Sequence, residues 1–581
     1  MWDMLPPGRL FLTSRRRSDV MKLWRRWIAL ALAAVLCCTL LAGCGEDGEE
    51  GAALSVCVGD DPVTLDPIYA QEAADQTILV HLYENLMRVS MDASGKTTVT
   101  AGMAKSVDQE ANYDGTVTYT FRLRSAKWSD GRAVQADDFV YAWRRLADPA
   151  SQSPYAELLS VVAGYDEARA AGDMTLLQVS AKNDTTLVVV LSGNYDWFLT
   201  EVCTSPATLP LRESAVQKLK EAADAANLQA QEAGEEGNAR WWSDPAALVT
   251  NGAYQVSDYE EGQALTLRRS QRYYGSQSGP GTLCFRFAGS PEEAWALYEA
   301  QEVDAVWAVP EAQLKELAAD ESWTGIPELN TYTVLFNCRR IQDPLIRQAF
   351  SLAIDRNALA EAAGTAVLPA EGLVPPGVPG DGENDFRSGD EPLLHNDPED
   401  YADNCREARE LMEQAGYDSG ASWGELEYLY VEEGNNAAVA EALCAMWQSA
   451  LGVRIVSRGV TEQELWAALR SGEYSVAGAD LDAVGNDAEC FLMQWTTSSP
   501  DNVLGYANSA YDTLMSIIAG ASDELARLGC LHDAEELLLT DYALSPLYTR
   551  RIDWQLREDL AGACRDARGW FVFSGVVERT V

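Results

Sequence analysis

The sequence predicts an α/β protein that is too long for a single hydrophobic core. Short apolar runs typical of strands lie among longer segments in which apolar residues recur every three or four positions, as in amphipathic helices. The chain has 581 residues, of which 47% are hydrophobic and 23% are charged, so it is globular and should fold as about three domains. No internal repeat interrupts this pattern.

Strands and helices are expected in mixed order along the chain. The predicted strands are the short runs at 53–58, 116–123, 186–191, 264–268 and 331–337. The predicted helices are the amphipathic segments at 137–146, 344–354, 404–414, 437–451, 461–471 and 527–539. Residues 213–240 are rich in Ala, Glu and Gln and predict an exposed helix with a glycine-containing loop. Residues 369–400 are rich in Pro, Gly and Asp and predict a long loop.

One stretch combines a polar turn with an aromatic helix. It reads KWSDGRAVQADDFVYAWRRLADP and covers residues 127–149. Gly131 supplies the positive φ that a tight turn after Trp128 needs. Asp137 and Asp138 then favour a helix start, where carboxylates meet free N–H groups and the positive end of the dipole. We expect this stretch to be mainly scaffold.

The charge excludes one class of partner. The formal net charge is −45 at pH 7, and nucleic acid binding requires clustered Lys and Arg to neutralise phosphates. We therefore expect no nucleic acid partner.

Motifs of catalysis and metal binding are missing. Only three His are present, at 81, 395 and 532, and His81 lies in an apolar run typical of a buried histidine. The chain has no GxSxG, HExxH, P-loop or strand-following GxGxxG motif. Its 12 Cys form no CxxC pair, so we expect most to be buried small hydrophobes and predict no metal site and no cofactor.

The N-terminus predicts export. From Met21 a basic segment precedes an apolar run over 28–41, which is shorter than the ~20 residues of a membrane-spanning helix and typical of a signal peptide. The run ends in LAGC, which resembles a bacterial lipobox whose Cys44 is lipidated. We assign 1–43 to a signal peptide with an upstream extension and 44–53 to the lipidated cysteine and a flexible tether. A cleaved signal with an incidental cysteine and an uncleaved anchor are the alternatives.

Eight motifs occur in the order found in one protein family. They are TLDP (64–67), LYENL (82–86), YTFRLRSAKWSDGRAVQADDFVYAWRRLADP (119–149), SPYA (153–156), VTNGAY (249–254), FNCRRIQDPLIRQAFSLAIDR (336–356), LGVRI (451–455) and SPLY (545–548). With them the chain resembles family 5 of the bacterial extracellular solute-binding proteins, the oligopeptide- and dipeptide-binding group that serves ABC importers. The resemblance covers about residues 54 to 570.

The resemblance implies a two-lobed clamshell with the periplasmic-binding-protein-like fold of type II. It implies three domains, of which the first is discontinuous. The first lobe would comprise 54–87, 191–329 and 545–581, with an extra outer domain at 88–190. The second lobe would comprise 330–544.

The resemblance also places ligand-binding residues in the cleft between the lobes. The family segment GWxADYxDPxxFL, whose Asp pairs with a peptide α-ammonium, appears here as ADLDAVGNDAECFL at 479–492, with Val484 at the position of that Asp. A valine cannot compensate a buried ammonium, although Asp480, Asp482 or Asp487 could substitute. Positions where relatives offer polar or cationic groups to a peptide carboxylate are here Gly364, Asn436 and Gly478. The expected ligand-binding residues are Ala73, on the loop after TLDP, Tyr155, Trp307, Asn436 on the loop before a helix, Asp480, Asp482 and Val484.

The function implied is solute capture without catalysis. The leading hypothesis is a lipid-anchored binding protein, outside the cytoplasm at the cell surface or in the periplasm, that delivers oligopeptides to an ABC permease and its ATPase subunits. It is expected to act as a monomer, held to the bacterial membrane through Cys44. One alternative is the same fold acting as a surface sensor or binding a non-peptide solute such as a metal chelate or glycoside. The other is a secreted enzyme.

Overall fold

The computed structural model describes residues 52–579, except 92–96, 235, 277–278, 318–325, 383, 389–391, 395, 418–424, 484 and 522. Contacts divide the chain into residues Met1–Glu50 and residues Gly51–Val581, and the second unit is described below. The predicted lipidation site Cys44, His395 and Val484 lie outside the described residues.

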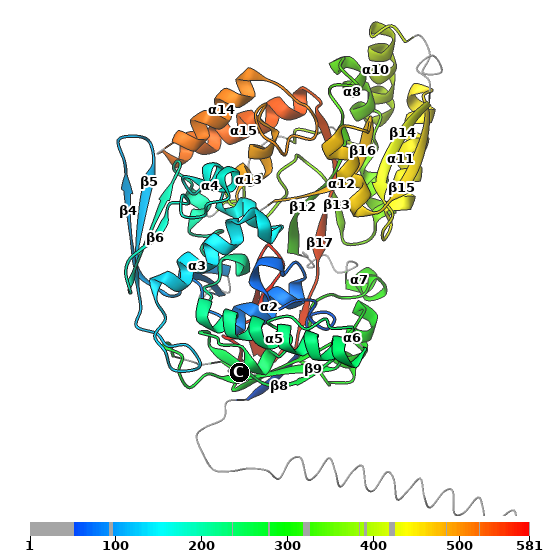
Figure 1. Cartoon of the computed structure of the whole chain (residues 1–581). Coiled ribbons are helices and arrows are strands. Elements are labelled where there is room, and N and C mark those ends of the chain that lie inside the picture. The colour runs from blue at the N-terminus through cyan, green and yellow to red at the C-terminus, as the bar shows by residue number, and fades with distance from the viewer. Residues whose placement is uncertain are drawn as a thin grey trace, which may run out of the picture. The chain divides into compact units, whose positions relative to one another are not determined.

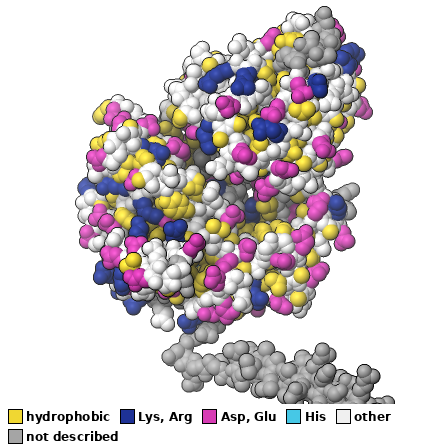
Figure 2. Space-filling model, turned by 45° about the vertical axis from the view of Figure 1, so that its right-hand side comes forward, with side chains coloured by type: hydrophobic (Ala, Val, Ile, Leu, Met, Phe, Trp, Pro, Cys, Tyr) yellow, Lys and Arg dark blue, Asp and Glu magenta, His cyan; other side chains and the backbone are white. Residues whose placement is uncertain are grey.

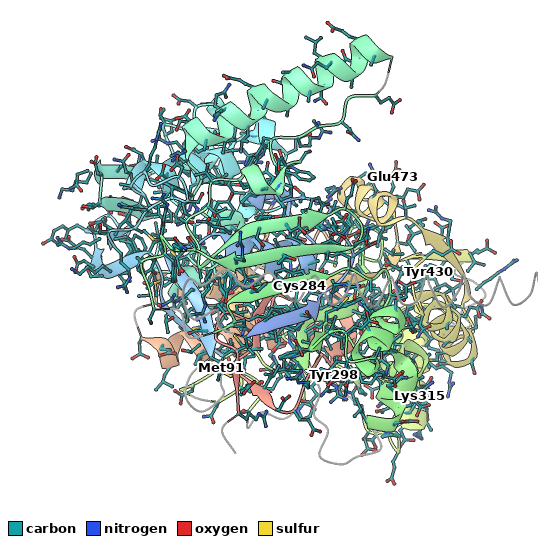
Figure 3. All side chains as sticks on the ribbon, turned by 90° about the horizontal axis from the view of Figure 1, so that it is seen from below. Met91, Cys284, Tyr298, Lys315, Tyr430 and Glu473 are labelled. Carbon is teal, nitrogen blue, oxygen red and sulfur yellow. The ribbon has the colours of Figure 1, made fainter. Side chains whose placement is uncertain are left out.

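The first of two large sheets forms the base of what we call lobe I (Figure 1). Its strand order is β18-β11-β1-β10-β9-β8, and β1 runs parallel to both of its neighbours. The strands are β1 (Ala53–Cys57), β8 (Tyr254–Glu260), β9 (Ala264–Arg269), β10 (Thr282–Arg286), β11 (Ala305–Val306) and β18 (Gln555–Leu556). The helices are α2 (Ala73–Leu82), α5 (Glu213–Ala233), α6 (Pro291–Glu299) and α7 (Glu311–Leu317). Figure 3 marks this sheet by Cys284 on β10, with Tyr298 of α6 and Lys315 of α7 to one side.

A four-stranded antiparallel sheet is inserted into this lobe, in the order β4-β5-β7-β6. Its elements are β4 (Ala104–Ala111), β5 (Val117–Leu123), α3 (Ala136–Ala147), α4 (Tyr165–Ala171), β6 (Val179–Asn183) and β7 (Thr186–Leu191), and the hairpin of β2 (Met87–Met91) and β3 (Thr97–Ala101) precedes them. The buried Asp138 accepts hydrogen bonds from the Trp128 indole at 3.0 Å and from the Gln135 backbone at 2.8 Å. This carboxylate therefore ties the turn to the start of α3, as expected of a scaffold.

The second large sheet forms lobe II, in the order β13-β17-β12-β16-β14-β15. Its strands are β12 (Ile326–Phe336), β13 (Val367–Pro369), β14 (Glu425–Val431), β15 (Arg454–Val460), β16 (Val476–Asp482) and β17 (Leu544–Ile552). Adjacent residues of β12 point to opposite faces, so that Val334 enters one hydrophobic core and Leu335 another. The covering helices are α8 (Pro344–Leu352), α9 (Arg356–Ala363), α10 (Tyr401–Gln414), α11 (Asn436–Leu451), α12 (Glu462–Ser471), α13 (Ala488–Leu492), α14 (Ser509–Gly520) and α15 (Glu524–Thr540).

Two connections join the lobes. The chain passes from α7 of lobe I to β12 of lobe II, and it returns from β17 through Asp553 and Trp554 to β18. The sequence assigned residues 545–552 to lobe I, but β17 is hydrogen-bonded between β12 and β13 in the lobe II sheet. Its buried side chains, including Leu547 and Tyr548, pack into a lobe II core. Residues 545–552 therefore belong to lobe II and not to lobe I. The other domain limits stay a prediction.

The predicted elements correspond closely to the observed ones. Each of the five predicted strands and six predicted helices matches a described element, with end shifts of a few residues. The exposed helix expected within 213–240 is α5, and between β13 and α10 the described residues contain no helix or strand. None of the described helices is long and apolar enough to cross a bilayer.

Candidate functional site

A cavity of about 460 Å³ lies where the two lobes meet. Lobe I contributes residues from the start of α2, from the SPYA segment and from the C-terminal segment, while lobe II contributes the first residues of β12 and the end of β16. Figure 2 shows the surface indented between the lobes, with acidic and basic side chains along the opening. The size is in the range of small-ligand sites. The lining comprises Gln71, Gln76, Pro154, Tyr155, Glu157, Leu158, Ser205, Glu328, Leu329, Asn330, Asp482, Ala483, Arg565, Ala567, Arg568 and Trp570.

Tyr155 forms part of the lobe I wall. Its hydroxyl donates to the carbonyl of Ala70 at 2.9 Å and accepts from Gln76 Nε2 at 3.0 Å. Burial raises the pKa of Tyr155 to about 12, so the hydroxyl is neutral at physiological pH. The side chain is a fixed polar group beside the cavity.

The three aspartates that the sequence offers in place of the carboxylate expected at the position of Val484 have different surroundings. Asp487 caps α13 and forms an ion pair with Arg527 at 2.7 Å. Asp480 forms an ion pair with Arg550. Asp482 is exposed at the cavity and accepts a hydrogen bond of 2.7 Å from the neutral amide of Asn330. Within the described residues, Asp482 is thus the one of the three that has no cationic partner.

Arg550 was not singled out from the sequence. Its guanidinium lies 5.8 Å from the ring of Tyr332 and 5.7 Å from that of Tyr548, and it contacts Asn436 Oδ1 at 3.4 Å. Burial raises the pKa of Asp480, and the positive charge of Arg550 opposes that shift. Arg550 therefore neutralises the carboxylate of Asp480, which was expected to bind a ligand.

Two further arginines come from the C-terminal segment. Arg568 is enclosed by Asp566, at 2.8 Å, and Glu201, at 3.1 Å, and is part of the scaffold. Arg565 lies 3.7 Å from Glu328, and its side chain is only 5% exposed. Burial raises the pKa of Glu328, whereas Arg565 lowers it. The segment CRDARGW carries no motif that predicts a site, and only the fold brings it beside Asp482.

The other predicted ligand-binding residues that the structure describes are not among the residues that line this cavity. Ala73 is the first residue of α2 and does not lie in a loop. The start of this helix is fixed to the TLDP segment, because the carboxylate of Asp75 accepts a hydrogen bond from the backbone N–H of Thr64 at 3.1 Å. Asn436 is the first residue of α11 rather than part of the preceding loop. Trp307 follows β11 and packs partly buried against the lobe I cores.

Gly478 has a steric explanation. An added Cβ there would contact the hydroxyls of Tyr332 and Tyr428, which are both buried. The two tyrosines therefore leave no room for a side chain at this position.

No group of His, Cys, Asp and Glu that could hold a metal ion is found among the described residues. His81 is buried, its Nδ1 lies 2.6 Å from the carbonyl of Thr77, and its Nε2 accepts from the backbone of Phe573 at 3.0 Å. It is a core histidine, as predicted. The described cysteines are free thiols, and most are buried.

Comparison with known proteins identifies the family. The model of the bacterial extracellular solute-binding proteins, family 5 Middle, matches residues 98–503. The chain belongs to this family. The family resemblance and the periplasmic-binding-protein-like fold of type II are therefore confirmed.

Curated relatives of this family 5 chain carry different ligand names. It is 29% identical to the probable deoxycholate-binding periplasmic protein YgiS of Escherichia coli, with 84% of this chain and 86% of the relative covered. It is 28% identical to the periplasmic oligopeptide-binding protein OppA of Haemophilus influenzae, with the same coverage of 84% and 86%.

Solved structures agree on the fold. The complex of Haemophilus influenzae OppA with the peptide RPPGFSPFR is 26% identical and has a TM-score of 0.68, covering 92% of this chain and 100% of that one. The unliganded open form of MppA, a periplasmic murein tripeptide-binding protein, has a TM-score of 0.67 at 24% identity, covering 88% and 94%.

Proposed function

We propose that this family 5 protein captures short peptides in the interlobe cavity and delivers them to an ABC importer. The cavity is lined from both lobes, so a bound ligand is enclosed on two sides. Closure is stabilised only by the difference in ligand contacts between the open and closed forms. No bond is made or broken, and the protein acts as a receptor rather than an enzyme. Affinities between micromolar and nanomolar, about −8 to −12 kcal/mol, suit such capture.

The observation that carries this proposal is the position of Asp482. Its carboxylate is exposed at the cavity and is hydrogen-bonded by Asn330, which brings no positive charge. Asp480 and Asp487 are already paired with arginines. Asp482 is therefore the group best suited to pair with a peptide α-ammonium in place of the family aspartate.

A second candidate ligand is an amphipathic carboxylate without an ammonium group. It is supported by the relative named as a probable deoxycholate-binding protein. Such a ligand has no use for Asp482, so the two candidates differ in their dependence on this residue.

The location and partners follow from the same proposal. Lipidation at Cys44 would hold the protein at the bacterial membrane outside the cytoplasm, as a monomer close to the permease and ATPase subunits. The LAGC sequence and the periplasmic relatives support this placement.

Native mass spectrometry of the full-length chain with a library of di- and tripeptides tests the function. Calorimetry on the tightest-binding peptide then compares wild type with Asp482→Asn, using the free and the N-acetylated peptide. Asp482→Asn should weaken binding of the free peptide by about 10- to 100-fold, because it removes a charge-assisted hydrogen bond. N-acetylation of the peptide should weaken its binding to wild type by a similar factor and should leave its affinity for Asp482→Asn unchanged.

Glu427→Gln is the matched control, because Glu427 pairs with Arg458 and neither residue lines the cavity. It should bind the free peptide like wild type. If the protein binds deoxycholate and no library peptide, peptide capture is refuted and the second candidate is favoured.

A further inference from the structure

Arg565 is a buried cation whose hydrogen-bonding capacity is not used up. Its Nη1 is buried and has no hydrogen-bond partner within the described residues. Its Nη2 lies 3.7 Å from Glu328 Oε1, within ion-pair range but beyond a hydrogen bond. The guanidinium stands 5.9 Å from the ring centroid of Phe571, which gives it a firm support on one side. A guanidinium offers five donors in a planar fork, so this arrangement leaves donors for another acceptor.

The guanidinium of Arg568, in the same segment, has protein acceptors for its hydrogen-bond donors. Arg568 donates to Asp566, to the Glu201 carbonyl at 2.8 Å and to Thr204 Oγ1 at 2.8 Å. Both arginines line the cavity, but only Arg568 is held by a complete set of protein acceptors. The difference marks Arg565 as the one suited to bind something else.

Glu328 is held as loosely as Arg565. Its contact with Arg565 is the ion pair at 3.7 Å, and its side chain is 25% exposed at the cavity. Burial raises the pKa of Glu328, the positive charges of Arg565 and Arg550 lower it, and the negative charge of Asp482 raises it. Arg565, Glu328 and Asp482 all line the cavity and therefore form one charged patch there.

We propose that Arg565 binds a carboxylate of the ligand, which takes the place of Glu328 beside the guanidinium. This inference rests on the proposed function and deepens it. With Asp482 as the partner of a cation and Arg565 as the partner of an anion, the cavity recognises a zwitterionic solute such as a short peptide with both ends free. Because Nη1 has no partner and Nη2 lies beyond hydrogen-bond distance of Glu328 within the described residues, the fork has two donors that could form paired hydrogen bonds with a carboxylate.

The test compares the tightest library peptide with its C-terminal amide, by calorimetry on the full-length chain. Wild type should bind the free acid about 10- to 100-fold more tightly than the amide, as expected for a charge-assisted pair. Arg565→Gln should reduce this ratio to about one by weakening the acid and leaving the amide unchanged. Glu328→Gln should strengthen the acid several-fold, because it removes the competing carboxylate, and should leave the amide unchanged.

Arg557→Gln is the control for loss of a positive charge, because Arg557 follows β18 in the same C-terminal segment but lies outside the cavity. It should keep the wild-type ratio of acid to amide. Equal binding of acid and amide by wild type would overturn the role of Arg565 while leaving peptide capture intact. Equal weakening of both forms by Arg565→Gln would show that the residue only supports the fold. Failure of every library peptide to bind would overturn both proposals.

Discussion

Removing Arg527 should destabilise the protein severely, because this side chain compensates two carboxylates where the lobes meet. Arg527 is 5% exposed and pairs with Asp487 at 2.7 Å and Glu489 at 2.8 Å, and Glu489 is itself 4% exposed. The indole of Trp197, from lobe I, donates to the same Glu489 at 3.2 Å. The cluster therefore joins α13 and α15 to lobe I.

The expected magnitude follows from burial. Breaking a buried ion pair by removing one partner costs about 3–5 kcal/mol, because the other charge stays buried and unpaired. Arg527→Met keeps the bulk of the side chain and removes the charge, so it should lower the free energy of unfolding by about that amount at pH 7. Burial already raises the pKa of Glu489, and loss of Arg527 should raise it further. The defect should therefore shrink as the pH falls and Glu489 takes up a proton.

Urea unfolding followed by tryptophan fluorescence measures the effect. The double variant Arg527→Met with Glu489→Gln should be more stable than Arg527→Met alone, because it removes the unpaired charge. Arg122→Gln is the control, since Arg122 and Asp108 form a pair whose side chains are 65% and 64% exposed, and it should leave the midpoint unchanged. A loss below about 1 kcal/mol in Arg527→Met, or full additivity of the two changes, would refute this reasoning.

Three further predictions follow from single residues. Cys44→Ser should release the protein from membranes in a fractionation experiment, and retention of the variant would indicate a membrane-spanning anchor instead. Burial lowers the pKa of His81 to about 4, so the folded state binds fewer protons than the unfolded state and His81 lowers stability as the pH falls from about 6.5 towards 4. His81→Gln should flatten this part of the unfolding free energy as a function of pH, and an unchanged slope relative to wild type would contradict a neutral buried imidazole. Gly478→Ala should cost about 1–3 kcal/mol in urea unfolding through overpacking against Tyr332 and Tyr428, and wild-type stability would show that these rings can move aside.

Most of the secondary structure could be predicted from the sequence, because it depends on local patterns, whereas the family and its fold were expected from the resemblance of eight motifs. Apolar periodicity locates a strand such as β7, Thr186–Leu191, which is predicted to the residue. A buried histidine within an apolar run, His81, is recognised for the same reason. The carboxylates of Asp137 and Asp138 in the first turn of α3 follow from the chemistry of free backbone N–H groups, which is a property of neighbouring residues.

The pairing of charges at the site required the tertiary structure. Asp480 and Asp482 are two residues apart and look equivalent in sequence, yet Asp480 meets Arg550 of β17 and Asp482 faces the cavity beside a neutral amide. Arg565 reaches Glu328 only because the chain returns to lobe I after β17. Whether a charged side chain is available to a ligand depends on which partner lies within a few ångströms. Residues distant along the chain supply that partner, and no local pattern records it.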